Sequence, residues 1–157
     1  MEHAQSLGQQ AIIAATLVAR AYRRRADEAL AGCGLSVVSA WPVLIVGRND
    51  GIRQNELAAL LGIEGPSLVR TLDRVEEGGL LVRRPDAKDG RAKTLHLTAD
   101  GRRMRAKIER VLQDLADEAF GGITEKDLLA SMRVFAQLDR MLIAMPAPAT
   151  SEKKGYR

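Results

Sequence analysis

The sequence contains few aromatic residues and a single cysteine. Aromatic side chains make up 3% of its 157 residues. The core must therefore be built from leucine, valine, alanine, isoleucine and methionine, which favours helices over a β-sandwich or barrel. Cys33 cannot form an intrachain disulfide, and this excludes a disulfide scaffold. Because no histidine neighbours Cys33 in the sequence, we interpret it as a bystander thiol in preference to a redox sensor.

Patterns for membrane insertion and secretion are also missing. No apolar run approaches the roughly 20 residues needed to span a bilayer. Residues 1–20 lack the basic start and apolar centre of a secretory signal, since Glu2 and Gln9-Gln10 occupy those places. We therefore expect a cytoplasmic protein without a membrane partner.

The chain has little that resembles catalytic or metal-binding machinery. Its two histidines are His3, near the N-terminus, and His96, in a predicted strand, and there is no GxSxG, phosphate-binding loop, CxxC or HExxH pattern. Asp86 and Asp89 suggest a carboxylate pair, but they flank basic residues in a predicted exposed loop with no wall to exclude water. We expect no enzyme, no metal site and no cofactor.

Apolar periodicity and glycine or proline breakers predict a mainly α chain with one small β-hairpin. The start of the second helix has two interpretations. If Ser39 caps it, Pro42 falls in the first turn, whereas a start at Ser36 would place Pro42 inside the helix and kink it. With Ser39 as the cap, helices are predicted over residues 5–30, 39–46, 54–61, 66–77, 99–120 and 125–145, and strands over 80–84 and 94–98.

The third and fourth helices form a predicted helix-turn-helix, because only Gly62 to Gly65 separate them. On the fourth helix, Leu68, Leu72 and Val75 lie at helical spacing and should pack inward. A second face carries two guanidinium groups and two hydroxyls, from Ser67, Arg70, Thr71 and Arg74.

This polar face suits the major groove of DNA, where guanidinium groups fork onto guanine acceptors. The helix N-terminus also offers free amides to a phosphate. Such a face is by itself more often an ordinary solvated surface. Its place after a tight turn and before a basic hairpin favours DNA binding. The arginines at 20 and 23–25 we interpret as a solvated helix face, with phosphate or dimer contacts as the alternatives.

The predicted hairpin is basic. Between residues 83 and 93, two acidic residues are outnumbered by five basic ones, Arg83, Arg84, Lys88, Arg91 and Lys93. An arginine at the loop tip can enter the minor groove, where narrow AT-rich stretches concentrate negative potential. Asp89 would pair with Arg91 and set its direction.

The segment from Gly62 to Leu80 and the loop Asp89-Gly90-Arg91-Ala92-Lys93 resemble the MarR family of transcription regulators, and most closely its SlyA-type subgroup. The resemblance covers about Leu7 to Met145. It implies a winged helix-turn-helix over 52–98, dimerisation or scaffold helices over 5–48 and 99–145, and a tail at 146–157 that we expect to be disordered. It also implies a homodimer on double-stranded DNA. The expected DNA contacts, with Pro66 added by the resemblance alone, are Pro66, Ser67, Arg70, Thr71, Arg74, Arg84, Asp89, Arg91 and Lys93.

Many members of this family bind small aromatic or phenolic anions between the dimerisation helices and the winged domain, and this weakens their hold on DNA. The resemblance therefore implies a repressor relieved by such an effector. Arg20, Tyr22 and Trp41 are the candidate ligand residues, although a core position is the preferred interpretation of each aromatic. Family members that sense oxidants usually carry their cysteine in the first helix, and Cys33 departs from that pattern.

A winged helix that binds another protein, without sequence-specific DNA binding, is the alternative function. Such modules often lack arginines on the recognition face, so Arg70 and Arg74 count against it. Salt dependence separates the two, because phosphate contacts release counterions.

Overall fold

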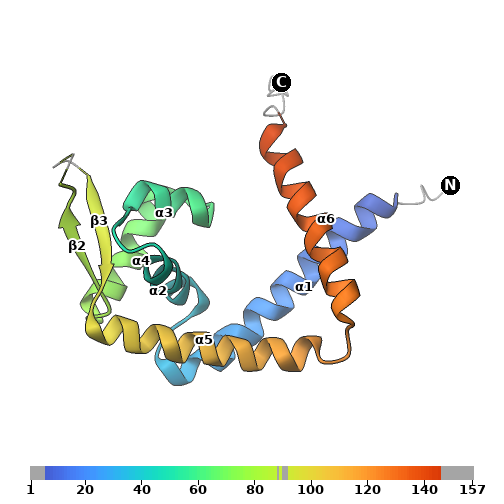
Figure 1. The fold of residues 1–157 in the computed structure, drawn as a ribbon, viewed down its shortest axis with the longest axis horizontal. Helices are drawn as coiled ribbons and strands as arrows, with labels where there is room; N and C mark the ends of the chain where they lie inside the picture. Colours follow the sequence, from blue (N-terminus) through green and yellow to red (C-terminus); the bar gives the residue numbers. More distant parts are fainter. Residues whose placement is uncertain (1–5, 88, 90–91, 146–157) are drawn as a thin grey trace, which may run out of the picture. The chain divides into compact units, whose positions relative to one another are not determined.

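The structure is a computed structural model that describes residues 6–87, 89 and 92–145 (Figure 1). The expectations for His3, Lys88, Arg91 and the tail at 146–157 lie outside these residues. The chain divides into two compact units after Ala119.

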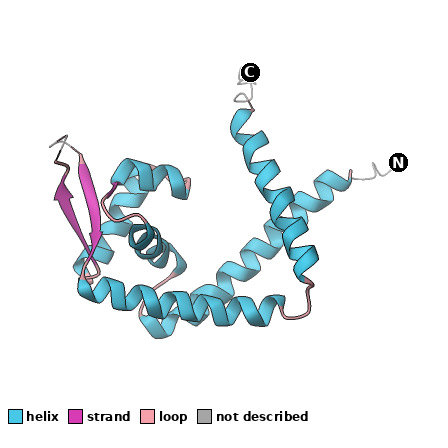
Figure 2. Ribbon diagram, viewed as in Figure 1, coloured by secondary structure: helices cyan, strands magenta, loops and turns pink. Residues whose placement is uncertain are grey.

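The described chain is mainly helical with a small antiparallel sheet, as predicted (Figure 2). The first unit contains the winged helix-turn-helix, and Figure 1 shows its hairpin beside the helix-turn-helix. In chain order the elements are α1 (Leu7–Leu30), η1 (Ala31–Cys33), α2 (Val37–Arg48), β1 (Ile52–Arg53), α3 (Gln54–Leu61), α4 (Gly65–Glu77), β2 (Leu81–Pro85), β3 (Lys93–Leu97), α5 (Ala99–Phe120) and α6 (Glu125–Ala144).

Helix α2 begins at Val37, earlier than the start at Ser39 that the sequence analysis preferred. Ser36 caps it, with its Oγ accepting from the amide of Ser39 at 3.4 Å. The carboxylate of Asp27 accepts from the amide of Val37 at 2.7 Å. The start at Ser39 was therefore wrong, and Pro42 lies inside the helix. The second cap comes from α1, so the sequence next to α2 could not reveal it.

The sheet has a third strand that the sequence analysis missed. The order is β1-β3-β2, with Ile52 opposite Leu95 and Arg84 opposite Thr94. β1 has two residues, too few for an alternating pattern to appear. The two predicted strands are present, each displaced by one residue toward the tip of the hairpin.

The hydrophobic core surrounds α4 and fixes its orientation. Leu68, Leu72 and Val75 are at most 1% exposed, as the periodicity predicted. They belong to one cluster with Leu57 of α3 and Leu95 of β3. Burying a leucine or valine side chain contributes about 1.5–3 kcal/mol. The stripe therefore decides which face of α4 is turned to solvent.

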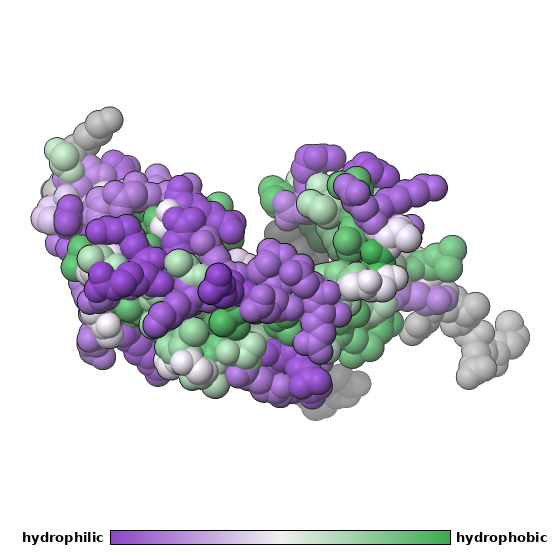
Figure 3. Space-filling model, turned by 60° about the horizontal axis from the view of Figure 1, so that its bottom comes forward, coloured by the Kyte–Doolittle hydropathy of each residue, from purple (hydrophilic) through white to green (hydrophobic). Residues whose placement is uncertain are grey.

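The two long end helices leave large apolar faces open. α1 buries only Ala26 and Leu30 among its residues, and no residue of α6 is buried. By contrast, hydrophilic residues predominate on the visible surface of the winged region (Figure 3). The exposed apolar residues of α1 and α6 are Leu7, Ile12, Ile13, Leu17, Val18, Leu129, Met132, Val134, Phe135, Met141, Leu142 and Ile143.

Among the described helices, no single one combines the length and apolar character that a bilayer span requires. The segment formed by α1 and η1 has the required length and apolar character only when it is taken together with α2. A bend of 77° separates the two segments.

Close packing at the start of α5 gives a stability prediction. A Cβ added at Gly101 would lie 1.9 Å from the carbonyl oxygen of Leu80, a backbone atom that cannot move aside cheaply. Gly101→Ala should lower the free energy of unfolding by about 1–3 kcal/mol, measured by urea denaturation. Gly32→Ala is the control, because a Cβ at Gly32 meets nothing within 4 Å. Equal stability of the two variants would contradict the packing argument.

Candidate nucleic-acid interface

The turn between α3 and α4 is set by backbone geometry. α3 ends at Gly62, whose φ of +61° is the left-handed conformation that glycine adopts without strain. Three residues later, α4 begins at Gly65 with Pro66 in its first turn, a position where the missing amide costs no helical hydrogen bond. In this first turn the amides of Ser67 and Leu68 both donate to the carbonyl oxygen of Glu64 at 3.1 Å, and Pro66 has no amide hydrogen. The turn therefore offers fewer free amides to a phosphate than the sequence predicts.

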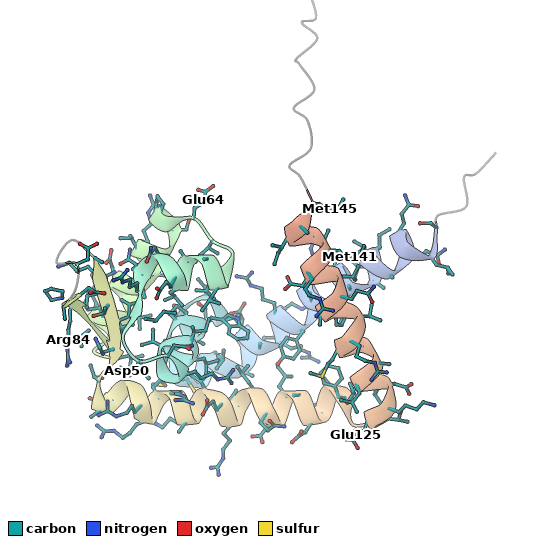
Figure 4. All side chains as sticks on the ribbon, turned by 45° about the horizontal axis from the view of Figure 1, so that its top comes forward. Asp50, Glu64, Arg84, Glu125, Met141 and Met145 are labelled. Carbon is teal, nitrogen blue, oxygen red and sulfur yellow. The ribbon has the colours of Figure 1, made fainter. Side chains whose placement is uncertain are left out.

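The outward face of α4 is polar and cationic. Pro66, Ser67, Arg70 and Arg74 are all exposed. Neither arginine forms a hydrogen bond or ion pair with any residue that the structure describes. Both guanidinium groups therefore keep all their donors for an external partner. Glu64, the residue just before α4, is labelled in Figure 4.

Thr71 does not share this exposed face, and the prediction that it would was wrong. It is 9% exposed, and its Oγ1 donates to the carbonyl oxygen of Ser67 at 3.1 Å. Its direction around the helix lies nearer to Val75 than to Arg74, because each residue turns the helix by about 100°. The hydroxyl is satisfied within the helix, as is common for threonine.

The wing contributes two further exposed cations, Arg84 on β2 and Lys93 on β3. Both lie toward the tip, where Pro85 is paired with Lys93 (Figure 4, Arg84 labelled). Asp89 is exposed at the tip, and its amide donates to Asp86 Oδ1 at 3.1 Å. Its pairing with Arg91 stays a prediction.

Asp86 holds the base of this loop. Its Oδ2 accepts from Arg53 Nε at 2.8 Å, so the wing is tied to the strand that precedes α3. The hydrogen bond and charge of Asp86 raise the pKa of Arg53 above its ordinary value. A raised pKa keeps the guanidinium charged far into the alkaline range, so this ion pair loses no strength through Arg53 near neutral pH. From the sequence, Asp86 was considered only as a catalytic carboxylate, and nothing indicated its pairing with Arg53.

Arg83 belongs to the hairpin but does not face solvent with the other cations. Its side chain is 19% exposed and forms ion pairs with Asp73 and Glu76 of α4. Arg83 therefore does not contribute its charge to the predicted basic surface of the wing. Nothing in the local sequence indicated that this arginine, and not Arg84, would turn inward.

His96 has a structural position in β3. Its Nδ1 lies 3.1 Å from Asp50 Oδ1, and its Nε2 lies 3.1 Å from Thr94 Oγ1. It thus links the turn before β1 to the central strand of the sheet.

A second feature is an apolar cleft of about 550 Å³ between α1, α2, the end of α3 and α5. Tyr22 is half-buried in its wall, and Trp41 is 44% exposed there, so neither is a sealed core residue. Arg20 does not line the cleft, but Arg23 does, because the lining face of α1 runs through Ala19, Tyr22 and Ala26. The lining residues are Ala19, Tyr22, Arg23, Ala26, Leu30, Val37, Val38, Ala40, Trp41, Leu44, Ile45, Leu60, Leu61, Ile63 and Leu112.

Known proteins share both this sequence pattern and this fold. A family model described as MarR family matches residues 34–92. The transcriptional regulator PA3341 is 31% identical over 85% of this chain and 98% of its own, with a TM-score of 0.78. A MarR-family transcriptional regulator from Rhodococcus sp. RHA1 is 28% identical over 85% of this chain and 94% of its own, with a TM-score of 0.74. A MarR crystal structure, 24% identical over 91% of this chain and 95% of its own, has a TM-score of 0.74 and supports the fold.

The role of Asp86 can be tested through the wing amides. Asp86→Ala removes the acceptor of the Asp89 amide and the partner of Arg53. Hydrogen exchange of the Asp89 amide should become about fivefold faster, since one hydrogen bond contributes about 1 kcal/mol. Asp114→Ala, an exposed change of the same charge on α5, should leave that rate unaltered. An unchanged rate in Asp86→Ala would show that Asp86 does not order the wing.

Proposed function

Since the chain belongs to the MarR family of transcription regulators, we propose that it is a homodimeric repressor that reads a pseudo-palindromic operator. The family consists of DNA-binding winged helix-turn-helix regulators and not of enzymes, which sets aside both alternatives weighed from the sequence. The single observation that carries the proposal is the pair of exposed arginines on α4, Arg70 and Arg74, which form no ion pair with any described residue. The segment from Gly62 to Leu80 supports a place near the SlyA-type subgroup.

In this proposal α4 enters the major groove and the wing enters the minor groove. Arg70 forks onto base acceptors, Arg74 adds a second cation, and Ser67 with Pro66 meets bases or backbone at the helix start. Arg84 and Lys93 contact phosphates beside the wing. Arg91 at the tip takes the minor groove, with Asp89 setting its direction.

The homodimer is supported by the open faces of α1 and α6. Long helices with wide apolar stripes need a partner surface, and described residues of the same chain leave these stripes exposed. A second copy related by a two-fold axis covers identical surfaces at once. Two copies of α4 would then read half-sites about 10 base pairs apart.

The apolar cleft supports an effector. Its size falls within the range of small-molecule sites, and its wall is apolar with two aromatics and a single exposed cation, Arg23. A small aromatic or phenolic anion fits that chemistry. Leu61 and Ile63 line the cleft at the end of α3 and in the turn before α4, so an occupant would press on the turn that positions the DNA-reading helix.

Arg70 provides the direct test of DNA reading. Arg70→Ala should cost about 1–3 kcal/mol of specific binding and relax the base preference at one position of each half-site, measured by competition between duplexes. Arg25→Ala on α1, an exposed arginine already paired with Glu28, is the charge-matched control. Unchanged discrimination in Arg70→Ala would remove Arg70 from the base-reading role.

The dimer can be tested by sedimentation. The wild-type chain should sediment as a dimer at micromolar concentration, and Phe135→Glu on the open stripe of α6 should shift it toward monomer, because a charge in an apolar interface is costly. Gln137→Glu, an exposed polar position on the same helix, should leave the dimer intact. A monomeric wild-type protein would refute this architecture.

Trp41 is the only tryptophan in the chain, so its fluorescence reports occupancy of the cleft. Benzoate should perturb this fluorescence at lower concentration than benzyl alcohol, its neutral counterpart. Arg23→Gln should weaken benzoate binding about threefold, since an exposed ion pair contributes roughly 0.2–1 kcal/mol. Arg20→Gln should have no effect, because Arg20 lies off the lining face. Equal effects of both substitutions would contradict the site.

A further inference from the structure

The charge of α4 is unusual for a helix that reads a polyanion. Within Gly65–Glu77 it carries two basic residues and three acidic ones, Asp73, Glu76 and Glu77. Residues three apart on a helix are neighbours, so Asp73 lies within reach of Arg70. An ion pair between them would occupy the guanidinium that the proposed function assigns to DNA. Yet Arg70 is exposed and unpaired with any described residue.

Arg83 of β2 accounts for this arrangement. Its Nη2 donates to Asp73 Oδ1 at 2.8 Å and to the carbonyl oxygen of Val69 at 3.3 Å. Its Nη1 donates to Glu76 Oε2. One guanidinium thus binds two carboxylates and a backbone oxygen of α4. Its 19% exposure allows less screening by solvent than Arg70 would have.

The two carboxylates do not depend on Arg83 to the same degree. Glu76 also accepts from the backbone amide of residue 83 at 3.1 Å, a contact that any side chain but proline preserves. Asp73 has no other hydrogen-bond partner among the described residues, and its side chain is 47% exposed. Loss of the Arg83 side chain would therefore release Asp73 while β2 stays attached to α4.

We propose that Arg83 is a positioning residue for DNA recognition, which holds Asp73 away from Arg70 so that Arg70 meets DNA unpaired. The inference rests on the proposed DNA-reading role of α4. It assigns Arg83 a function without contact with DNA, in contrast to the exposed cations Arg84 and Lys93. The wing thereby affects how α4 binds the major groove, in addition to contacting the minor groove itself.

The experiment uses the full chain and the duplex that the wild-type protein enriches most from a randomised library. Arg83→Met removes the guanidinium and keeps an apolar stem of similar length. It should weaken binding about tenfold, as expected for the loss of one base-reading arginine. Asp73→Asn alone should bind within about twofold of wild type, because no carboxylate is left to capture Arg70.

The double variant Arg83→Met/Asp73→Asn tests whether Arg83 acts through Asp73. It should recover to within about threefold of wild type, a coupling that additive effects at independent sites would not produce. A double variant as weak as Arg83→Met would overturn the proposal, since Arg83 would then contact DNA itself or only support the fold. Full affinity in Arg83→Met would overturn it as well.

Three controls keep these outcomes separate. Arg25→Met reports the effect of losing one positive charge away from α4. Thermal unfolding followed by circular dichroism reports whether each variant is folded. If Arg83→Met does not fold, Arg83→Lys replaces it, because one ammonium nitrogen does not reproduce the separate contacts of Nη1 with Glu76 and Nη2 with Asp73. The same rescue by Asp73→Asn is then required. Failure of the wild-type chain to enrich any duplex would refute the proposed function and not this inference alone.

Discussion

The buried stripe of α4 is the constraint on which the other features of this protein depend. Leu68, Leu72 and Val75 are sealed against α3 and the sheet, so the helix has one possible rotation about its axis. That rotation turns Arg70 and Arg74 to solvent and carries Thr71 inward. Because the stripe contributes several kcal/mol by burial, polar contacts at the surface cannot reorient the helix. They can only decide which of its exposed groups are free to bind.

The arginines around this helix fall into two functional kinds. Arg53 and Arg83 are tied to carboxylates, the first at the base of the wing and the second against α4. Arg70, Arg74 and Arg84 are exposed and have no ion-pair partner among the described residues. The tied arginines neutralise acids next to the proposed interface and connect its two parts. The net charge of +4 is therefore a poor guide to binding, and the distribution of free cations is the relevant quantity.

Periodicity and breaker residues were sufficient to predict the helices, the hairpin and the inward face of α4, because these depend on local sequence. Apart from Thr71, whose hydroxyl bonds to Ser67 one turn earlier, the features that the sequence did not reveal involve partners from other elements. The start of α2 depends on Asp27 of α1, and β1 is a strand only because β3 lies beside it. The inward position of Arg83 depends on two acids of α4, seven and ten residues away. Arg20 was expected to line the pocket, but Arg23 lines the cleft, because a cluster of arginines does not show which one lies on the lining face of α1.

Sequence-specific reading by α4 and the wing is best measured by selecting duplexes from a randomised library at two salt concentrations. The protein should enrich a two-fold symmetric sequence whose half-sites lie about 10 base pairs apart. Its affinity for this sequence should fall steeply with salt, because cations of α4 and the wing displace counterions. Binding without any sequence enrichment would contradict DNA reading by α4, as would an absence of binding at low salt.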